Sequence, residues 1–238
     1  MATVQRLTTE QGLQAELALL ASVCEGRQED GVLLWQPVDQ ALVMPRRMER
    51  LPDFAQGAAA VDALGWPVLL RETGGEPVPQ SPATVNVALV YAAPRIEGDL
   101  NRLERAYLRL CQPLCHALEC LGGKATLGEV AGAFCDGRYN VNLDGRKWVG
   151  TAQRWRQSRH HGGPVVLVHG AMLMHDQRAA MVAAVNRFNQ ACGLPQRCNA
   201  DSHVALDQRF PGQYVLDDVQ AWIARELTDI RGLHQRVP

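Results

Sequence analysis

The sequence lacks a surplus of charge of either sign, a long apolar run and the pattern of a secretory leader. Its formal net charge is −1 over 238 residues, whereas dedicated nucleic-acid binders usually carry a clear basic surplus. No stretch of about 20 apolar residues is present, as a transmembrane helix would require. The first residues do not follow the charged, apolar and small-residue order of an export signal. These absences predict no nucleic-acid partner, no membrane attachment and a cytoplasmic location.

Several nucleotide-binding and catalytic motifs are also missing. The chain has neither a G-x-x-x-x-G-K-[ST] phosphate loop nor a G-x-G-x-x-G fingerprint, and no G-x-S-x-G supports a serine triad. The seven cysteines are an odd number, so we expect reduced thiols rather than a disulfide framework. Cys111, Cys115 and Cys120 share one predicted helix with a stripe of leucines. We therefore predict thiols of the core there, and no metal site.

Hydrophobic periodicity and turn signals outline the predicted elements. Apolar residues make up 47% of the chain, which is enough for a sizeable core. Because helices and strands mix without a regular βαβ order and no linker divides the chain, we predict an α+β fold in a single domain. Strands 31–37 and 40–45 are expected to pair with each other. The other predictions are strands at 67–71, 84–91 and 164–175, and helices at 8–24, up to Gly65, and at 98–121, 176–193 and 215–232.

The segment RETGGEPVPQ, residues 71–80, places two adjacent glycines directly after a predicted strand. Gly74 and Gly75 lack side chains, so a ligand can approach their backbone, and their N–H groups can hold a carboxylate or a phosphate. Arg71 and Thr73 can add hydrogen-bond donors. A Gly-Gly pair is more often an ordinary turn, and the residues alone leave both interpretations open.

A single lysine, Lys147, lies in the segment GRYNVNLDGRKWVGTAQRWR, residues 137–156. The Asp144-Gly145 dipeptide predicts a tight hairpin turn just before it. Small residues follow at positions 150–152, as at a site where a substrate lies against the backbone. A lysine at the surface would serve solubility, whereas a lysine on a buried strand face needs a partner, and an anionic ligand is one. The pattern leaves these two interpretations open.

A histidine and two cysteines complete the candidate groups. His169 and Gly170 end an apolar strand, where a histidine is more often structural than catalytic, although the glycine permits close approach. Cys135 lies in the loop before the predicted hairpin, and Cys192 lies at the end of a predicted helix. Either thiol could serve as a nucleophile if it lay near Lys147, because a neighbouring cation lowers the pKa of a thiol.

Three segments, in this order, resemble the catalytic domain shared by lipoate–protein ligase A, the octanoyltransferases and the biotin–protein ligases. RETGGEPVPQSPATVNVALVY is similar to R-R-x-G-G-G-A-V-x-H-x-x-G-x-x-N, and LVHGAML is similar to a His-Gly-[ST] strand. GRYNVNLDGRKWVGTAQR is similar to G-R-N-D, a strand and then G-[KR]-K with G-x-A. The resemblance runs from about residue 13 to about residue 205. It implies one catalytic domain over residues 1–238, with a mixed, largely antiparallel sheet packed by helices and without the small C-terminal accessory domain.

The resemblance also implies roles for individual residues. Lys147 matches the family's essential lysine, which contacts the acyl carbonyl and the adjoining phosphate of an acyl-adenylate. Such a fixed cation stabilises the oxyanion that forms when an amine attacks the carbonyl. No metal-ligating side chain is implied. The implied substrate-binding positions are Arg71, Thr73, Gly74, Gly75, Gln80, Asn86, Tyr139, Asn140, Gly150, Thr151, Ala152, His169 and Gly170.

Two activities follow from the resemblance. A ligase would activate lipoate or octanoate with ATP and Mg²⁺ as an acyl-adenylate. An octanoyltransferase would need no ATP and would form a thioester on Cys135 or Cys192. A relative that binds an acyl group or a lipoyl domain without turnover is a further alternative, because Glu72, Glu76 and Gln80 stand where the family has arginine, glycine and histidine.

The implied partner is a lipoyl carrier domain, either of a 2-oxoacid dehydrogenase subunit or the glycine-cleavage H protein, whose lysine accepts the acyl group. A separate accessory protein or an acyl carrier protein is a further implied partner. The ligase is the leading prediction. Tyr139 and Asn140 replace the family's Asn-Asp pair, however, and with it a carboxylate that would help to hold a magnesium nucleotide.

Overall fold

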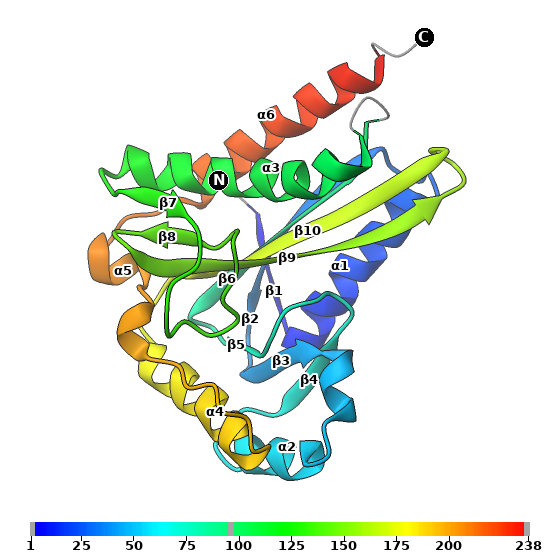
Figure 1. Ribbon diagram of the computed structural model, residues 1–238. Helices are drawn as coiled ribbons and strands as arrows, with labels where there is room; N and C mark the ends of the chain where they lie inside the picture. The colour runs from blue at the N-terminus through cyan, green and yellow to red at the C-terminus, as the bar shows by residue number, and fades with distance from the viewer. Residues whose placement is uncertain (1–2, 95–97, 236–238) are drawn as a thin grey trace.

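The computed structural model describes residues 3–94 and 98–235, and two β-sheets organise it (Figure 1). The larger sheet has seven strands in the order β1-β2-β6-β10-β9-β8-β7, and the smaller has the order β4-β3-β5. In the larger sheet β1 and β2 are parallel and the other neighbours are antiparallel. The strands are β1 (Val4–Leu7), β2 (Asp30–Pro37), β3 (Ala41–Pro45), β4 (Val68–Arg71), β5 (Val78–Gln80), β6 (Thr84–Ala92), β7 (Ala125–Leu127), β8 (Val141–Leu143), β9 (Arg146–Ser158) and β10 (Gly163–Leu173).

Helices surround both sheets. Helix α1 packs on β2, β6 and β10, α3 packs on β7 to β10 with α6 beside it, and α2 and α4 pack together next to the smaller sheet (Figure 1). No helix in the described ranges is long and apolar enough to cross a membrane. The helices are α1 (Thr9–Cys24), α2 (Phe54–Asp62), α3 (Asp99–Cys120), α4 (Arg178–Ala191), α5 (Leu206–Arg209) and α6 (Leu216–Gln235), with 3₁₀ turns η1 (Arg46–Arg50) and η2 (Ala200–Ser202).

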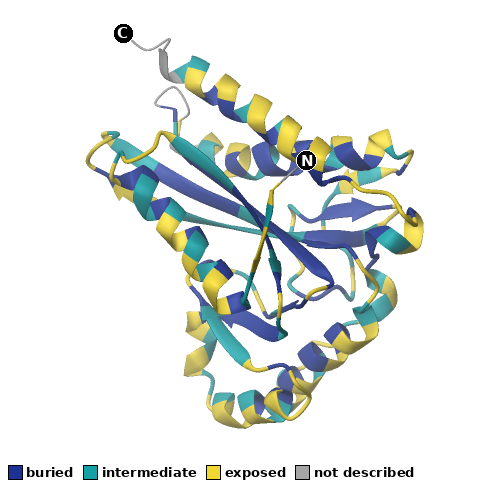
Figure 2. Cartoon of the chain, turned by 180° about the vertical axis from the view of Figure 1, so that it is seen from behind, coloured by how far each residue is buried: buried dark blue, intermediate teal, exposed yellow. Residues whose placement is uncertain are grey.

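Strand β6 shows how the large sheet divides the core. All nine of its residues are buried, as Figure 2 shows for the centre of the sheet. Val87 and Leu89 pack in the cluster that contains α3, whereas Ala88 and Val90 pack in the cluster that contains α1. Because successive side chains of a strand point to opposite faces, the two helices cover opposite faces of the sheet. The predicted α+β fold with a mixed, largely antiparallel sheet is confirmed.

The predicted pairing of residues 31–37 with 40–45 is wrong, although both segments are strands. β2 pairs with β1 and β6, while β3 pairs with β4 and β5 in the smaller sheet. All five residues of β3 are buried, because β3 lies between β4 and β5 in the smaller sheet. A two-stranded hairpin with β2 would leave β3 at an edge and less buried. Residues 4–7, for which no strand was predicted, form the edge strand β1.

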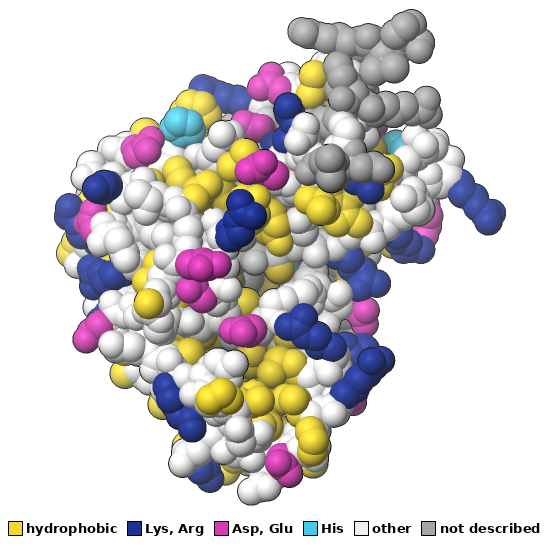
Figure 3. All heavy atoms as spheres, in the orientation of Figure 1, with side chains coloured by type: hydrophobic (Ala, Val, Ile, Leu, Met, Phe, Trp, Pro, Cys, Tyr) yellow, Lys and Arg dark blue, Asp and Glu magenta, His cyan; other side chains and the backbone are white. Residues whose placement is uncertain are grey.

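The surface mixes charge and apolar groups. On the face drawn in Figure 3, basic and acidic side chains are interspersed with hydrophobic ones, in keeping with the net charge of −1. The seven cysteines all lie in described residues, and none of them forms a disulfide.

Helix α1 begins at the predicted cap and lies directly on a tryptophan. The Thr8 hydroxyl accepts from the Gln11 backbone N–H, while the Gln11 side chain accepts from the Thr8 backbone N–H. One turn later, a Cβ atom at Gly12 would lie 2.3 Å from ring atoms of the buried Trp35. The glycine therefore allows this close packing, and Trp35 Nε1 can donate to the buried carboxylate of Glu16.

We predict that Gly12→Ala lowers the free energy of unfolding by about 1–3 kcal/mol, because the added methyl group overpacks against Trp35. Helix propensity alone predicts the opposite sign, since alanine is favoured over glycine by about 1 kcal/mol in a helix interior. Gly232 in α6 has no heavy atom within 4 Å of its Cβ position, so Gly232→Ala is the matched control and should stabilise. Urea unfolding followed by circular dichroism measures both changes. A gain in stability for both variants would contradict the packing argument.

Candidate active site

A narrow cavity lies where α1, the two sheets and the loop before β8 meet. Its volume is about 40 Å³. A wider cavity of about 390 Å³ adjoins it and shares Leu13, Glu16, Arg71 and His169 with it. Nine of the predicted site residues line the narrow cavity: Arg71, Gln80, Asn86, Cys135, Gly150, Thr151, Ala152, His169 and Gly170.

The register of β9 and β10 brings two distant small-residue segments together. Ala152 pairs with His169, and Thr151 pairs with Gly170, in an antiparallel ladder. At Gly170 a Cβ atom would lie 2.9 Å from a methyl group of Val149, so only glycine fits without a shift. These residues form one wall of the narrow cavity, where a flat and apolar ligand segment can lie close to the backbone.

Lys147 is buried, with 2% of its surface exposed. Its Nζ atom donates to the backbone carbonyls of Phe134 at 2.7 Å and Cys135 at 2.6 Å. Burial lowers the pKa of the ammonium group. An ammonium has three donors, and these two bonds leave one for a ligand. Lys147 and Gly150 both line a small cavity of about 20 Å³, and a Cβ atom at Gly150 would lie 3.2 Å from Nζ.

Cys135 lies against the Gly-Gly loop. Its φ of 45° is in the left-handed region, which is uncommon for a residue with a side chain and recurs at functional sites. The Sγ atom accepts from the Glu76 backbone N–H at 3.2 Å. A Cβ atom at Gly75 would lie 2.8 Å from Sγ and 2.9 Å from Arg71 Nη2, so Gly75 leaves the space in which thiol and guanidinium approach each other. Donors of this kind stabilise negative charge on sulfur.

The loop that carries Cys135 is held by an aspartate that the motifs do not reveal. Asp136 Oδ1 accepts from the backbone N–H groups of Val130 and Gly137 and from the Asn140 amide. Asn140, predicted to bind substrate, is therefore engaged in building the loop. An Asp-Gly dipeptide is the signal that could have indicated this turn.

Tyr139 also shapes this loop and is not among the residues that line the narrow cavity. Its ring stacks on Tyr107 of α3 with ring centres 4.3 Å apart. Its backbone carbonyl accepts from the Thr151 hydroxyl at 2.8 Å, which ties the loop to β9. The structure thus places Tyr139 between helix α3 and the cavity wall.

A buried glutamate joins the predicted histidine. His169 Nδ1 donates to Glu16 Oε2 at 2.7 Å, and Nε2 lies 3.1 Å from the Thr73 hydroxyl. Trp35 donates to the other oxygen of Glu16 at 3.0 Å. Glu16 and Trp35 were missed from the sequence, although a glutamate on the apolar face of a predicted helix is a signal that it meets a polar partner.

Gln80 and Asn86 are paired with each other. Gln80 Nε2 donates to Asn86 Oδ1 at 3.0 Å, and Asn86 Nδ2 donates to Gln80 Oε1 at 2.9 Å. Thr84 adds a third hydrogen bond to Gln80 Oε1. This buried amide pair lines the cavity with its polar groups satisfied, so it contributes a fixed wall.

The arginines around the Gly-Gly loop are engaged by the protein itself. Arg71 is buried, which lowers its pKa, and its guanidinium donates to the carbonyls of Val43, Gly74 and Glu76. This fixes the loop that begins at the end of β4.

Glu72, the next residue, accepts hydrogen bonds from two arginines. Arg46 Nε reaches Glu72 Oε1 at 3.0 Å, and Arg154 Nη1 reaches Oε2 at 2.9 Å. Both hydrogen bonds lower the pKa of the Glu72 carboxyl group, and the one from Arg46 has the larger effect. The carboxylate therefore ties η1 and β9 to the Gly-Gly loop.

Cys192, the other candidate nucleophile, lies elsewhere. It caps the end of α4, where its sulfur donates to the Asp53 carbonyl at 3.5 Å and would contact any side chain at Gly57. Burial raises the pKa of its thiol. The structure thus brings Cys135, and not Cys192, to Lys147. No group of three or more histidine, cysteine or acidic side chains among the described residues is arranged to hold a metal ion.

His203 is a neighbour of the site that the sequence did not reveal. Its Nε2 atom accepts from the Phe134 backbone N–H at 3.2 Å, and Nδ1 donates to the Asn199 carbonyl at 3.0 Å, which defines a neutral ring. Burial, with the nearby charge of Lys147, lowers the pKa of His203 to about 4. No local pattern marks it, because its contact with Phe134 spans 69 residues.

Comparison with known sequences places the chain in a family. The model of the lipoyl protein ligase A/B catalytic domain matches residues 9–228. An uncharacterized protein of Cupriavidus necator is 34% identical over 222 residues, which cover 87% of this chain and 84% of that protein. The chain belongs to the lipoyl protein ligase A/B catalytic domain family. The resemblance seen in the three motifs is confirmed, and so is the prediction of an enzyme of this class.

Two curated relatives are named octanoyl-[GcvH]:protein N-octanoyltransferase. That of Kyrpidia tusciae is 36% identical over 147 residues, which cover 56% of this chain and 46% of the enzyme. That of Anoxybacillus flavithermus is 29% identical over 152 residues, which cover 64% of this chain and 52% of that enzyme. The chain thus spans about half the length of these two relatives.

Solved structures share the fold. A lipoate-protein ligase A bound with ATP matches with a TM-score of 0.66 and 16% identity, over 98% of this chain and 84% of that one. A bi-partite lipoate protein ligase from Thermoplasma acidophilum, described with its E2 lipoyl domain, matches with a TM-score of 0.61 and 18% identity. The match covers 97% of this chain and 84% of that one. At these identities the likeness establishes the fold.

We predict a loss of stability in mild acid that depends on His203. The pKa of its ring is about 4 in the folded chain and 6.5 ordinarily, so between these values the unfolded chain binds the proton more readily. The stability contributed by the neutral ring is fully present above pH 6.5 and is lost as the pH falls through 4, by up to about 3 kcal/mol. Urea unfolding at several pH values between 7 and 4 measures this slope.

His203→Gln cannot be protonated and should flatten that part of the profile. The matched control is His175→Gln, since His175 is exposed and paired with Asp207 at the surface. An acid slope in His203→Gln as steep as that of the unmodified protein would contradict the assignment.

Proposed function

We propose that this chain transfers an octanoyl or lipoyl group to a lysine of a carrier protein through a thioester on Cys135. The observation that carries the proposal is the joint position of Cys135 and Lys147, because the lysine's ammonium donates to the carbonyl of the cysteine itself. The octanoyltransferase names of two relatives support the transfer of an octanoyl group.

The thiol has the surroundings that thioester chemistry needs. Cys135 lines the apolar cavity, where an acyl chain can lie along the wall made by Gly150 and Ala152. Its sulfur accepts from the Glu76 N–H and lies beside the space that Gly75 leaves next to the Arg71 guanidinium. The predicted alternative nucleophile, Cys192, has no comparable access to the cavity.

The proposed reaction has two steps that balance. In the first, the Cys135 thiol gives up its proton as its sulfur attacks the carbonyl carbon of an acyl thioester; a C–S bond to Cys135 forms, the donor's C–S bond breaks, and the donor thiol leaves with that proton. In the second, the ε-amine of the carrier lysine attacks the new thioester, a C–N bond forms, and the C–S bond to Cys135 breaks. The amine's proton returns to the thiol, so the enzyme is restored without ATP.

Lys147 would serve both steps. We propose that its third N–H donates to the carbonyl oxygen of a thioester on Cys135, beside Gly150, whose Cβ position lies 3.2 Å from Nζ. A donor placed at that oxygen stabilises the negative charge of the tetrahedral intermediate, and one such donor is typically worth about 10²–10³ in rate. The lowered pKa of the ammonium also suits it to exchange a proton with the attacking or leaving group.

An ATP-dependent ligase is the second candidate, since a ligase A with bound ATP has the same fold. The residues around the Gly-Gly loop fit a nucleotide poorly. Arg46 and Arg154 are bonded to Glu72, and Arg71 is bonded to backbone carbonyls. A triphosphate at this loop would meet the carboxylates of Glu72 and Glu76 beside arginines that are already bonded to protein groups. We assign no step to ATP or Mg²⁺.

We propose a lipoyl carrier domain as the acceptor, either a 2-oxoacid dehydrogenase subunit or a glycine-cleavage H protein. The bi-partite ligase described with its E2 lipoyl domain supports a dehydrogenase subunit as acceptor. The term GcvH in the names of the transferases supports an H protein. We further propose that residues 1–238 act as one catalytic unit. An acylated H protein or acyl carrier protein would be the donor, and no accessory protein is needed for thioester transfer.

We predict that Cys135→Ser abolishes transfer, with a loss of at least about 10³ in rate, because an alcohol does not replace the thiolate. Cys192→Ser is the matched control and should stay within about twofold of the unmodified rate, as it lies outside the cavity. The assay incubates the enzyme with an apo lipoyl domain and either an octanoyl thioester of a carrier protein or octanoate with Mg·ATP. Intact-mass spectrometry reads the acylated product and any acyl-enzyme.

Three outcomes would overturn this assignment. Acylation only with ATP would favour the ligase. Full activity of Cys135→Ser with the thioester donor would exclude Cys135 as the nucleophile. Binding without acylation under either condition would indicate a relative that does not turn over.

We also predict that Lys147→Met lowers kcat by about 10²–10³ while the chain stays folded, because the side chain keeps its volume but loses its charge. Lys124, the chain's other lysine, is exposed, and Lys124→Met should leave kcat unchanged. Circular dichroism and the melting temperature report the fold. Normal turnover in Lys147→Met would contradict the proposed role.

A further inference from the structure

One histidine contacts both the loop that carries Cys135 and the strand that carries Lys147. His203 is buried, and its Nε2 atom accepts from the backbone N–H of Phe134, the residue before Cys135. On its other side the backbone of residues 203 and 204 runs beside Lys147, where the Val204 N–H donates to the Lys147 carbonyl at 2.9 Å. His203 therefore connects the strand of the lysine to the loop of the cysteine.

The ring also supports the same loop by packing. It stacks on Phe134 with ring centres 4.1 Å apart and planes 24° from parallel. Lys147 Nζ lies 5.6 Å from the centre of the Phe134 ring. Lysine, phenylalanine and histidine thus form one packed stack, and a shift of the histidine would move the two carbonyls that receive the Lys147 hydrogen bonds.

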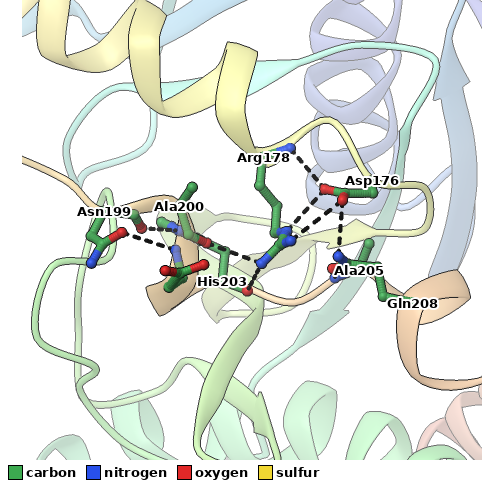
Figure 4. A network of polar contacts seen from close by, with 8 residues as sticks. Asp176, Arg178, Asn199, Ala200, His203, Ala205 and Gln208 are labelled. Carbon is green, nitrogen blue, oxygen red and sulfur yellow. Dashed lines mark hydrogen bonds and ion pairs between the residues drawn. The ribbon is translucent and has the colours of Figure 1, made fainter.

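A network of polar contacts around Arg178 holds the backbone at His203 in place (Figure 4). Arg178, at the start of α4, donates to the carbonyls of Ala200 and His203 at 3.3 Å and 3.1 Å. Asp176 accepts from the same guanidinium at 2.9 Å and from the Gln208 amide at 2.8 Å. These bonds join α4, η2 and α5, so the backbone that bears His203 is held by three elements.

The charged groups that face the ring come from three directions. Lys147 on β9 and Arg178 on α4 are cations, and Asp136 in the Cys135 loop is an anion. Burial first, and then two cations against one anion, favour the neutral ring, and a neutral ring is required because Nε2 accepts the Phe134 N–H. The hydrogen-bonding pattern therefore allows one tautomer, with its proton on Nδ1.

We propose that His203 is a positioning residue for the acyl transfer: as the neutral Nδ1–H tautomer it fixes the Phe134–Cys135 backbone against Lys147, so that thiol and ammonium keep their relative placement. This inference rests on the proposed function. Misplacement of a catalytic group by about 1 Å can cost about 10²-fold in rate, so a residue that only holds the backbone can have a large effect.

Three substitutions separate positioning from general stability. His203→Gln keeps an acceptor for the Phe134 N–H and a donor for the Asn199 carbonyl. His203→Asn is polar but too short to reach both partners, and His203→Leu fills the space without either bond. His175→Gln is the control, at an exposed histidine outside the site. The measurements are kcat and KM for the apo lipoyl domain with an octanoyl thioester donor at pH 7.5, the melting temperature, and the rate at which iodoacetamide modifies Cys135.

We expect His203→Leu and His203→Asn to lower kcat by about 10- to 100-fold, with KM for the carrier within about twofold. The rate of Cys135 modification should change in the same variants, because the Lys147 bond to the Cys135 carbonyl is disturbed. His203→Gln should retain kcat within about threefold. If His203→Leu does not fold, the comparison of His203→Asn with His203→Gln decides.

Two results would overturn the proposal. One is a kcat equal to that of the unmodified protein in folded His203→Leu or His203→Asn. The other is an equal loss of kcat in His203→Gln and His203→Asn at similar melting temperatures. Cys135→Ser in the same assay distinguishes a failure of the positioning role of His203 from a failure of the proposed thioester. If it is inactive while His203→Asn is fully active, the positioning role fails alone, and if it is active, the proposed thioester fails.

Discussion

The burial of one ammonium group is the constraint on which the rest of the site depends. A lysine deprived of water must be given hydrogen-bond acceptors, and Lys147 finds them in two consecutive backbone carbonyls, those of Phe134 and Cys135. Carbonyls of neighbouring residues converge on one point only where the chain bends sharply. The left-handed backbone of Cys135 provides that bend, and it directs the thiol toward Gly75 and Arg71. Charge burial thus sets the shape of the loop, and the loop sets the position of the sulfur.

The large sheet supplies the fixed frame for this arrangement. The β8–β9 hairpin delivers Lys147, and the neighbouring β10 delivers His169 and Gly170 in register with the small residues of β9. Helix α1 closes the other side through Glu16, whose carboxylate bonds both His169 and Trp35. Rigid elements therefore carry the cation and the wall of small residues, while a short loop carries the proposed nucleophile.

The sequence predicted the parts of the site that local patterns mark. The Asp144-Gly145 turn and the small residues after Lys147 are short-range signals, and three motifs in order identified the family. The partners of those residues were hidden because they are distant along the chain. His203 meets Phe134 across 69 residues, and β3 joins a second sheet rather than its neighbour β2. Cys135 and Cys192 were equal candidates until the fold placed one of them in the cavity, since pairing and packing depend on burial that no local pattern specifies.

The positive φ of Cys135 has a consequence for how this protein would respond to selection. A residue with a side chain costs about 1–2 kcal/mol in the left-handed conformation, and glycine does not. A glycine at position 135 would relieve that strain and also remove the thiol. If the proposed thioester forms on Cys135, screens that reward heat resistance would enrich a variant without the nucleophile, and those that reward acyl transfer would keep the strained residue. Under that proposal, backbone geometry at residue 135 sets thermal stability against function.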